Sequence, residues 1–269
     1  MRPSSLSLRP GEWGGPSRRV AVLGSGPGWA VLDQPAPPAE DPSLGSDRLE
    51  SLLRERQAGG APSVRTLFPG SGVSAVFPLA GMGGAVPFAG DLGVLSRLRE
   101  EYGSDRWTLR FRLLARGAPD RRELVCDLPV AVHRSEPRSL VSRRTGRKAS
   151  TVFRRLLDGP GLSLWEARTS FLRPDQIRLH AAESGIRIAG ESVYAREDPV
   201  SRSDLPGGRR PGGRSFVLLE GPAVHLAGLE IPSLDQGRFR SPPPKVMAKW
   251  ISAYLKEEKD LQSREDWLF

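Results

Sequence analysis

Short apolar runs, most of them closed by glycine or proline, recur along the whole chain and limit what it can fold into. Apolar side chains that alternate with polar ones over about four to eight residues are typical of half-buried strands. The segments with this character are 20–23, 29–32, 107–113, 124–130, 151–156, 162–169, 215–219 and 224–231. Because only a few segments have helical spacing, the sequence predicts an α+β fold with a mixed, mostly antiparallel sheet and flanking helices.

Two helices are predicted in the N-terminal half of the chain. Asp47 and Glu50 have the spacing of a capping box at the start of the first helix. Asp91 is predicted to cap the second helix, which ends at Gly103. The leucines expected on the buried sides are Leu49, Leu52 and Leu53 in the first helix and Leu92, Leu95 and Leu98 in the second.

Two further helices are predicted in the C-terminal half. One has Pro174 in its first turn and stops at Gly185, in keeping with the preference for proline at helix starts and glycine just past helix ends. The other follows three consecutive prolines and is expected over about residues 245–260.

The glycine-rich stretch 24–28 invites interpretation as a phosphate-binding loop. However, Pro27 lies inside it, and a second strand follows where a dinucleotide site requires a helix. The stretch therefore predicts a hairpin turn that binds no nucleotide.

Composition divides the chain into three parts. Residues 1–18 are rich in proline, serine, glycine and arginine, which predicts a disordered basic arm, although such a start also fits an organellar transit peptide. Residues 19–240 are expected to form one folded domain, and residues 241–269 a C-terminal helical tail. Within the domain, 204–214 is expected to be a flexible basic loop.

The charge favours a polyanionic partner. The chain has 40 lysines and arginines against 31 acidic residues, a formal net charge of +9, and most of the cations are arginine. Arginine presents a planar fork of donors that suits phosphate and stacks on bases, so nucleic acid is the expected partner. A purely compositional enrichment of arginine would give the same total charge.

Cysteine and histidine are scarce. The single cysteine, Cys126, cannot form an internal disulfide and fits a reducing, cytoplasmic compartment. Three histidines without a paired cysteine motif give no metal-site spacing, and no apolar run is long enough for a membrane span. We therefore expect a monomer without metal, cofactor or membrane segment.

The most distinctive segment is LRPDQIRLHA at 172–181, followed by Gly185, IAGE at 188–191 and Tyr194. It resembles, without a gap, the signature GRTHQIRVHLA..GHPIVGD..YG of RluA-type pseudouridine synthases. Weaker matches to the same family occur in the correct order at 29–35, 146–151 and 224–229. The resemblance extends over roughly residues 20–240 and implies a pseudouridine synthase catalytic domain with a central basic cleft.

The chemistry of this family requires one aspartate, which acts as nucleophile or base at the sugar of the target uridine. The family places it in an Arg-Leu-Asp turn, and Pro78, Leu79 and Ala80 occupy these positions here. No shift of the alignment restores an acid, because residues 68–90 contain neither aspartate nor glutamate. The resemblance therefore implies an RNA-handling fold whose catalytic position reads Ala80.

Four residues are implied to line the RNA-binding pocket: Arg173, Gln176, Arg178 and Phe111. Phe111 takes the place of the family's tyrosine, so it could stack on a base but has no exchangeable proton. Gln176 and Arg178 could equally hold adjacent loops, and His180 is expected to be a packed core histidine. Asp175 is the candidate acid to substitute for the missing aspartate, since it lies two residues from Arg173.

Three functions fit these observations. The favoured one is an RNA-binding homologue, directed at rRNA or tRNA, that has lost all or nearly all uridine isomerase activity. The first alternative is an active synthase that uses an unrecognised acid such as Asp175. The second alternative is a protein-interaction scaffold without an RNA role.

Overall fold

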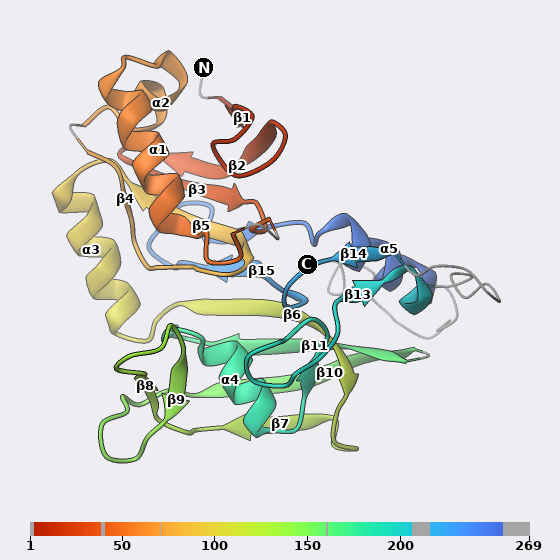
Figure 1. The fold of residues 1–269 in the computed structure, drawn as a ribbon. Coiled ribbons are helices and arrows are strands. Elements are labelled where there is room, and N and C mark those ends of the chain that lie inside the picture. Colours follow the sequence, from red (N-terminus) through yellow and green to blue (C-terminus); the bar gives the residue numbers. More distant parts are fainter. Residues whose placement is uncertain (1–2, 39–40, 71, 160, 206–215, 255–269) are drawn as a thin grey trace. The chain divides into compact units, whose positions relative to one another are not determined.

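The chain forms two compact units, each assembled from two separate pieces of sequence. The computed structural model describes residues 3–38, 41–70, 72–159, 161–205 and 216–254. Unit 1 comprises 1–109 and 226–241, and unit 2 comprises 110–225 and 242–269. The α+β class is confirmed, since antiparallel strands and a few helices make up both units (Figure 1). The expected single domain over 19–240 differs from this division.

Unit 1 is built on strands in the order β1-β2-β3-β5-β15, with β4 beside β5 and β16 beside β15. Their bounds are β1 Ser5–Leu8, β2 Arg18–Gly26, β3 Trp29–Gln34, β4 Ser74–Ala75, β5 Gly83–Ala89, β15 Val224–Glu230 and β16 Arg238–Arg240. β2 and β3 pair up to Gly26 and Trp29, and Gly28 in the turn has a φ of +73°. The hairpin predicted at 24–28 is therefore confirmed.

Part of the predicted disordered arm is an ordered strand. β1 pairs with β2, and the side chains of Leu6 and Leu8 are buried, as is that of Trp13. The prediction of disorder over 1–18 is wrong for these residues because Ser-Leu-Ser-Leu at 5–8 alternates with the period of a half-buried strand. Four alternating residues are easily overlooked among prolines and glycines.

Three helices cover unit 1: α1 (Ser46–Ala58), α2 (Pro62–Leu67) and α3 (Leu92–Gly103). α1 buries its leucines as predicted, but Gly45 is its N-cap, and no side chain caps it. The predicted capping box is wrong because Glu50 instead accepts a hydrogen bond from the amide of Ala75, at 2.8 Å. The N-cap role of Asp91 is confirmed, since its carboxylate accepts from the Val94 amide at 2.9 Å. Leu92 is 80% exposed, so its predicted burial is wrong.

Unit 2 is built on strands in the order β6-β11-β10-β7, with β12 beside β6. The bounds are β6 Thr108–Gly117, β7 Glu123–Cys126, β10 Thr151–Gly159, β11 Leu162–Thr169 and β12 Arg187–Ile188. Two small ribbons accompany them, β8 (Val130–Val132) with β9 (Ser139–Val141) and β13 (Val200–Ser201) with β14 (Val217–Leu219). The predicted strand over 124–130 is thus two strands, and Pro129 lies between them.

The described part of unit 2 contains two α-helices and one short 3-10 helix, η1 (Arg202–Asp204). Helix α4 (Gln176–Glu183) lies against β10, and it begins two residues after Pro174 (Figure 1). Helix α5 (Lys245–Tyr254) buries Trp250, which packs so tightly on Gly159 that a Cβ there would lie 2.8 Å from the indole. The part of the predicted C-terminal tail that forms α5 therefore belongs to this unit's core, and residues 255–269 lie outside the described residues.

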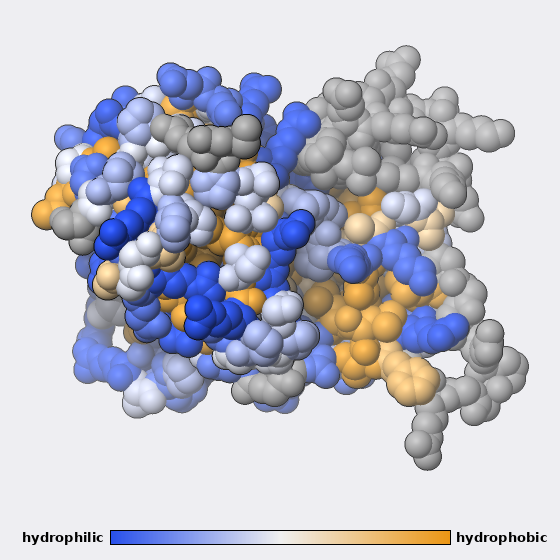
Figure 2. Space-filling model, turned by 90° about the horizontal axis from the view of Figure 1, so that it is seen from above, coloured by the Kyte–Doolittle hydropathy of each residue, from blue (hydrophilic) through white to orange (hydrophobic). Residues whose placement is uncertain are grey.

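The surface is mostly hydrophilic, with hydrophobic side chains gathered in patches, one of them on the right of the view in Figure 2. No helix within the described ranges has the length and apolar character needed to cross a membrane. The same ranges contain no cluster of side chains that could hold a metal ion. The predicted basic loop falls almost wholly on 206–214, outside the described residues.

Candidate functional site

The turn that the sequence resemblance aligns with the family's catalytic position, around Ala80, belongs to unit 1 and is fixed by hydrogen bonds to its main chain. The Leu79 carbonyl accepts from the Ser46 amide at 2.9 Å and from the side-chain amide of Gln34 at 3.1 Å. The Leu79 amide donates to the Ser46 hydroxyl at 3.0 Å. Gln34 also donates to the Met82 carbonyl at 2.9 Å. The shape of this turn therefore does not depend on the side chain at position 80.

Ala80 itself is exposed and forms an isolated antiparallel bridge with Gly45. The two backbones approach so closely that a Cβ on Gly45 would lie 2.5 Å from the Leu79 carbonyl oxygen. The turn thus keeps an ordered conformation and presents a methyl group at position 80, which the sequence resemblance aligns with the family's carboxylate. A methyl group can neither attack a sugar nor accept a proton.

Gln176, the first residue of α4, is fully buried and completely occupied by internal hydrogen bonds. Its carbonyl oxygen accepts from the Arg173 amide at 2.8 Å. Its amide nitrogen lies within hydrogen-bond distance of three oxygens, those of the Ser150 carbonyl and of the Thr151 and Thr169 hydroxyls, at 3.0–3.2 Å. Gln176 therefore holds the segments around the helix start together, which is the alternative to RNA contact that the sequence left open.

Arg178 makes a buried ion pair. Its guanidinium donates to both carboxylate oxygens of Glu191, at 2.5 and 2.9 Å, and to Asp175 at 3.1 Å. It also lies over the ring of Tyr194, 5.4 Å from the centroid. Burial alone would lower the pKa of Arg178, but the hydrogen bonds and charges of Glu191 and Asp175 outweigh it and raise the pKa. Arg178 is thus a structural cation, with its side chain only 14% exposed.

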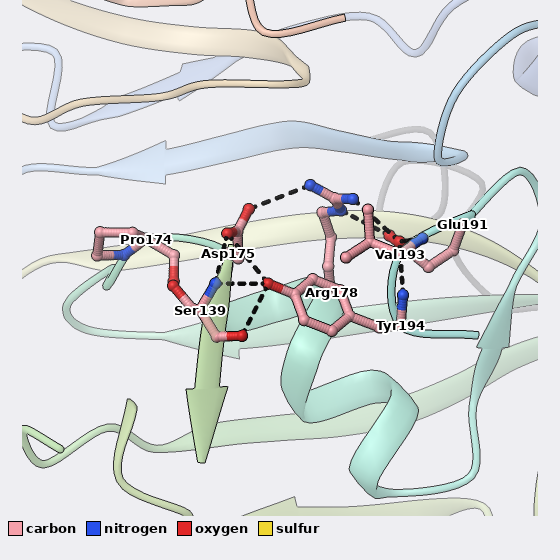
Figure 3. Close-up of polar contacts among 7 residues, drawn as sticks. All are labelled: Ser139, Pro174, Asp175, Arg178, Glu191, Val193 and Tyr194. Carbon is pink, nitrogen blue, oxygen red and sulfur yellow. Dashed lines mark hydrogen bonds and ion pairs between the residues drawn. The ribbon is translucent and has the colours of Figure 1, made fainter. Parts of the chain in front are cut away.

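Asp175 lies at the centre of this network. Figure 3 shows its carboxylate directed toward the guanidinium of Arg178 and the hydroxyl of Tyr194. One oxygen accepts from Arg178, and the other is 3.1 Å from the Tyr194 hydroxyl and 3.2 Å from the Ser139 amide. Its backbone has a φ of +54°, an uncommon conformation for a residue with a side chain. Both carboxylate oxygens of Asp175 are therefore engaged in internal contacts, which join the start of α4 to β9 and to Tyr194.

His180 is completely buried, as expected for a packed core histidine. One ring nitrogen, Nε2, lies 2.8 Å from the Leu128 carbonyl, to which only a protonated nitrogen can donate. The other, Nδ1, lies 2.9 Å from the Thr151 hydroxyl and accepts from it when the ring is neutral. Burial lowers the pKa of His180, which keeps the ring neutral.

Arg173 remains partly accessible. Its Nε donates to the Lys148 carbonyl at 3.3 Å, and its guanidinium lies 4.3 Å from the centroid of the Phe171 ring. No acidic residue pairs with it among the residues that the structure describes. The sequence implied two arginines in the RNA-binding pocket. Carboxylates neutralise Arg178, whereas Arg173 has no carboxylate partner among the described residues.

Arg173 borders a pocket of about 690 Å³ within unit 2. The other walls come from the β8–β9 hairpin and the loop that leads to β10. Four arginines line it, namely Arg134, Arg144, Arg147 and Arg173. The sequence signal for the first three was a run from 133 to 148 with six lysines and arginines and one acid. Apart from the match at 146–151, this run contributes to the sequence prediction only through the overall charge of the chain.

Phe111, also in unit 2, is fully buried in β6. An RNA base could stack on this ring only after the surrounding side chains had moved. The structure therefore groups Arg173, Asp175, Gln176 and Arg178 at the start of α4, whereas Phe111 is part of the core. Ala80 belongs to the other unit.

Comparison with known proteins gives matches at the level of structure. No family model and no curated protein sequence matches this chain. The solved structure of human RNA pseudouridylate synthase domain containing 4 matches 87% of this chain and 92% of its own, with a TM-score of 0.63 and 15% identity. Human RNA pseudouridylate synthase domain containing 1 matches 84% of this chain and 83% of its own, with a TM-score of 0.55 and 17% identity. The fold implied by the signature at 172–194 is confirmed: this chain has the fold of a pseudouridine synthase domain.

Proposed function

We propose that this protein is an RNA-binding homologue of RluA-type pseudouridine synthases that does not isomerise uridine. The observation that carries the proposal is the turn at Ala80, which is ordered and has no acid from residue 68 to residue 90. Isomerisation needs a carboxylate in contact with the sugar, because the glycosidic bond must be broken before uracil can rejoin through carbon. A turn without a carboxylate cannot supply this step.

Asp175 does not compensate for the missing aspartate. Its two oxygens are used by Arg178, Tyr194 and the Ser139 amide, so a nucleophilic attack would require it to abandon these partners. Loss of the Asp175 partner would leave the buried Arg178 with less compensation, which is costly in a low-dielectric site. These contacts argue against the alternative of an active synthase.

The charge and the fold together support RNA as the partner. The net charge is +9, and arginines gather on unit 2 around Arg173. The two matched human structures are named as RNA pseudouridylate synthase domain proteins. A fold can keep its ability to bind RNA after the catalytic residue is lost, so this likeness supports RNA as the partner. We infer structured rRNA or tRNA as the ligand class, held by phosphate contacts and shape.

The test is to map pseudouridine by mass spectrometry in rRNA and tRNA after incubation with the purified full chain. We expect no conversion, whereas an active synthase run in parallel converts its own target. Stoichiometric pseudouridine would overturn the proposal, and loss of that activity in Asp175→Asn would identify the acid. Absence of RNA crosslinking would instead favour the scaffold alternative.

A further inference from the structure

We propose that the arginine pocket of unit 2, defined by Arg134, Arg144, Arg147 and Arg173, binds the phosphodiester backbone of an RNA strand. The inference rests on the proposed function and names the part of the molecule that holds the RNA. It differs from the expectation based on Gln176 and Arg178, whose hydrogen bonds are internal.

The first observation is uncompensated charge. None of the four arginines forms an ion pair with an acid anywhere in the described ranges, and no acid lines the pocket. The two carboxylates closest in sequence are already engaged, Glu136 with Arg138 and Asp175 with Arg178. Like charges gathered on one pocket repel each other, and an anion bound among them removes that repulsion.

The second observation is that the pocket walls are fixed. Arg147 and Val130 exchange backbone hydrogen bonds of 2.9 and 3.0 Å, which attach the loop that leads to β10 to strand β8. Ser139 of β9 donates from its hydroxyl to the Pro174 carbonyl at 2.9 Å and from its amide to Asp175. The hairpin is thereby attached to the segment that carries Arg173. Such preorganisation lowers the entropy cost of binding.

The third observation concerns which phosphate compound fits. The pocket also has an apolar wall, made by Val132, Leu140 and Pro174, and Val132 is 63% exposed. Inorganic phosphate would leave this wall in water, whereas the sugar or base of a nucleotide would cover it. The volume of about 690 Å³ lies in the range of nucleotide-sized sites. An RNA segment satisfies both the cationic and the apolar surface.

The experiment measures binding of a fluorescent single-stranded RNA and of a tRNA transcript to the full chain over a range of salt concentrations. The test variant combines Arg134→Gln, Arg144→Gln and Arg147→Gln. The matched control combines Arg97→Gln, Arg121→Gln and Arg122→Gln, which removes the same charge from exposed positions outside the pocket. Unchanged thermal midpoints show that both variants are folded.

We expect the pocket variant to bind RNA about tenfold or more weakly. Its slope of log affinity against log salt should also fall by about two, because each phosphate contact on a single strand contributes roughly 0.7. The control should change both quantities much less. Excess inorganic phosphate at matched ionic strength should not displace the RNA.

The inference is wrong if pocket and control variants lose equal affinity, or if an acidic peptide binds the pocket as tightly as RNA. In the first case the full chain still binds RNA and the proposed function stands. If the unmodified chain does not bind RNA at all, the proposed function fails with the inference.

Discussion

The turn around Ala80 and the segment at 172–194 are held in place by different kinds of contact. The turn is held by hydrogen bonds to its main chain, so its shape does not depend on the side chain at position 80. The later segment keeps its side chains, because Gln176, Arg178 and Glu191 supply the hydrogen bonds that close the loop. The match at 172–194 therefore bears on the fold, whereas the loss of catalysis is a proposal that rests on the turn.

The largest loss of stability is expected from Glu191→Ala, which tests whether side chains hold the segment at 172–194 together. Glu191 is the buried partner of Arg178 and also accepts from the Val193 and Tyr194 amides at 2.8 and 3.1 Å. Removing one side of a buried pair costs roughly 3–5 kcal/mol in unfolding free energy. Urea denaturation measures this loss. Glu136→Ala, which breaks an exposed ion pair with Arg138, should leave the urea midpoint unchanged.

A smaller loss is expected from Gln176→Leu. Leucine cannot accept the hydrogen bond that the Arg173 amide donates to the side chain of Gln176, so this amide is left without its acceptor. The three oxygens that Gln176 contacts keep other hydrogen bonds; they belong to Ser150, Thr151 and Thr169. One unsatisfied buried donor costs about 2 kcal/mol. Glu183→Ala, on the exposed side of the same helix, should stay within about 0.5 kcal/mol. Equal losses in the two variants would show that Gln176 does not hold the helix start.

The buried His180 should make stability depend on pH. Because burial lowers its pKa in the folded state, the unfolded chain binds the proton more readily. Its contribution is complete above about pH 6.5 and is lost as the pH falls, by at most about 1.4 kcal/mol per unit. Denaturation at pH 7.5, 6.5 and 5.5 should show a shallower dependence for His180→Gln. Parallel curves would contradict this assignment.

The smallest effect is expected from Ala80→Asp. The position is exposed and the turn is held by its main chain, so stability should change by no more than about 0.5 kcal/mol. Ala85→Asp, in the buried strand β5, should by contrast prevent folding or destabilise severely. We expect at most a trace of pseudouridine from Ala80→Asp. A marked loss of stability would show that the turn depends on its side chain after all.

The sequence predicted those parts of the fold whose signals are local. The hairpin at Pro27, the N-cap at Asp91 and the strand from Leu162 to Thr169 follow from turn chemistry, capping and alternation. The capping box at Asp47 failed because the partner of Glu50 is the amide of Ala75, which is distant in sequence.

The site was predicted only in part, for the same reason. The absence of an acid from residues 68–90 could be read directly from the sequence, and the assignment of Ala80 to the catalytic position stays a prediction. Most partners of Gln176 and Arg178 could not, because the oxygens of Ser150, Thr151, Thr169 and Glu191 lie 7–26 residues away and are brought together by packing. The pocket arginines appeared as a basic run, but nothing in the run shows that Arg134 and Arg147 line the same pocket as Arg173.

Each of the two units is made of two separate stretches of sequence, and this has a consequence for synthesis on the ribosome. β5 has β15 as a neighbour, and α5 places Trp250 on Gly159, so each unit is completed by a segment translated after residue 223. Neither core can close while the nascent chain is shorter than this. A truncated product would expose the part of the β5 edge that β15 covers, and an exposed strand edge is a template for aggregation. We therefore expect folding to wait until β15 and α5 have emerged, and chaperone dependence to be greatest just before they do.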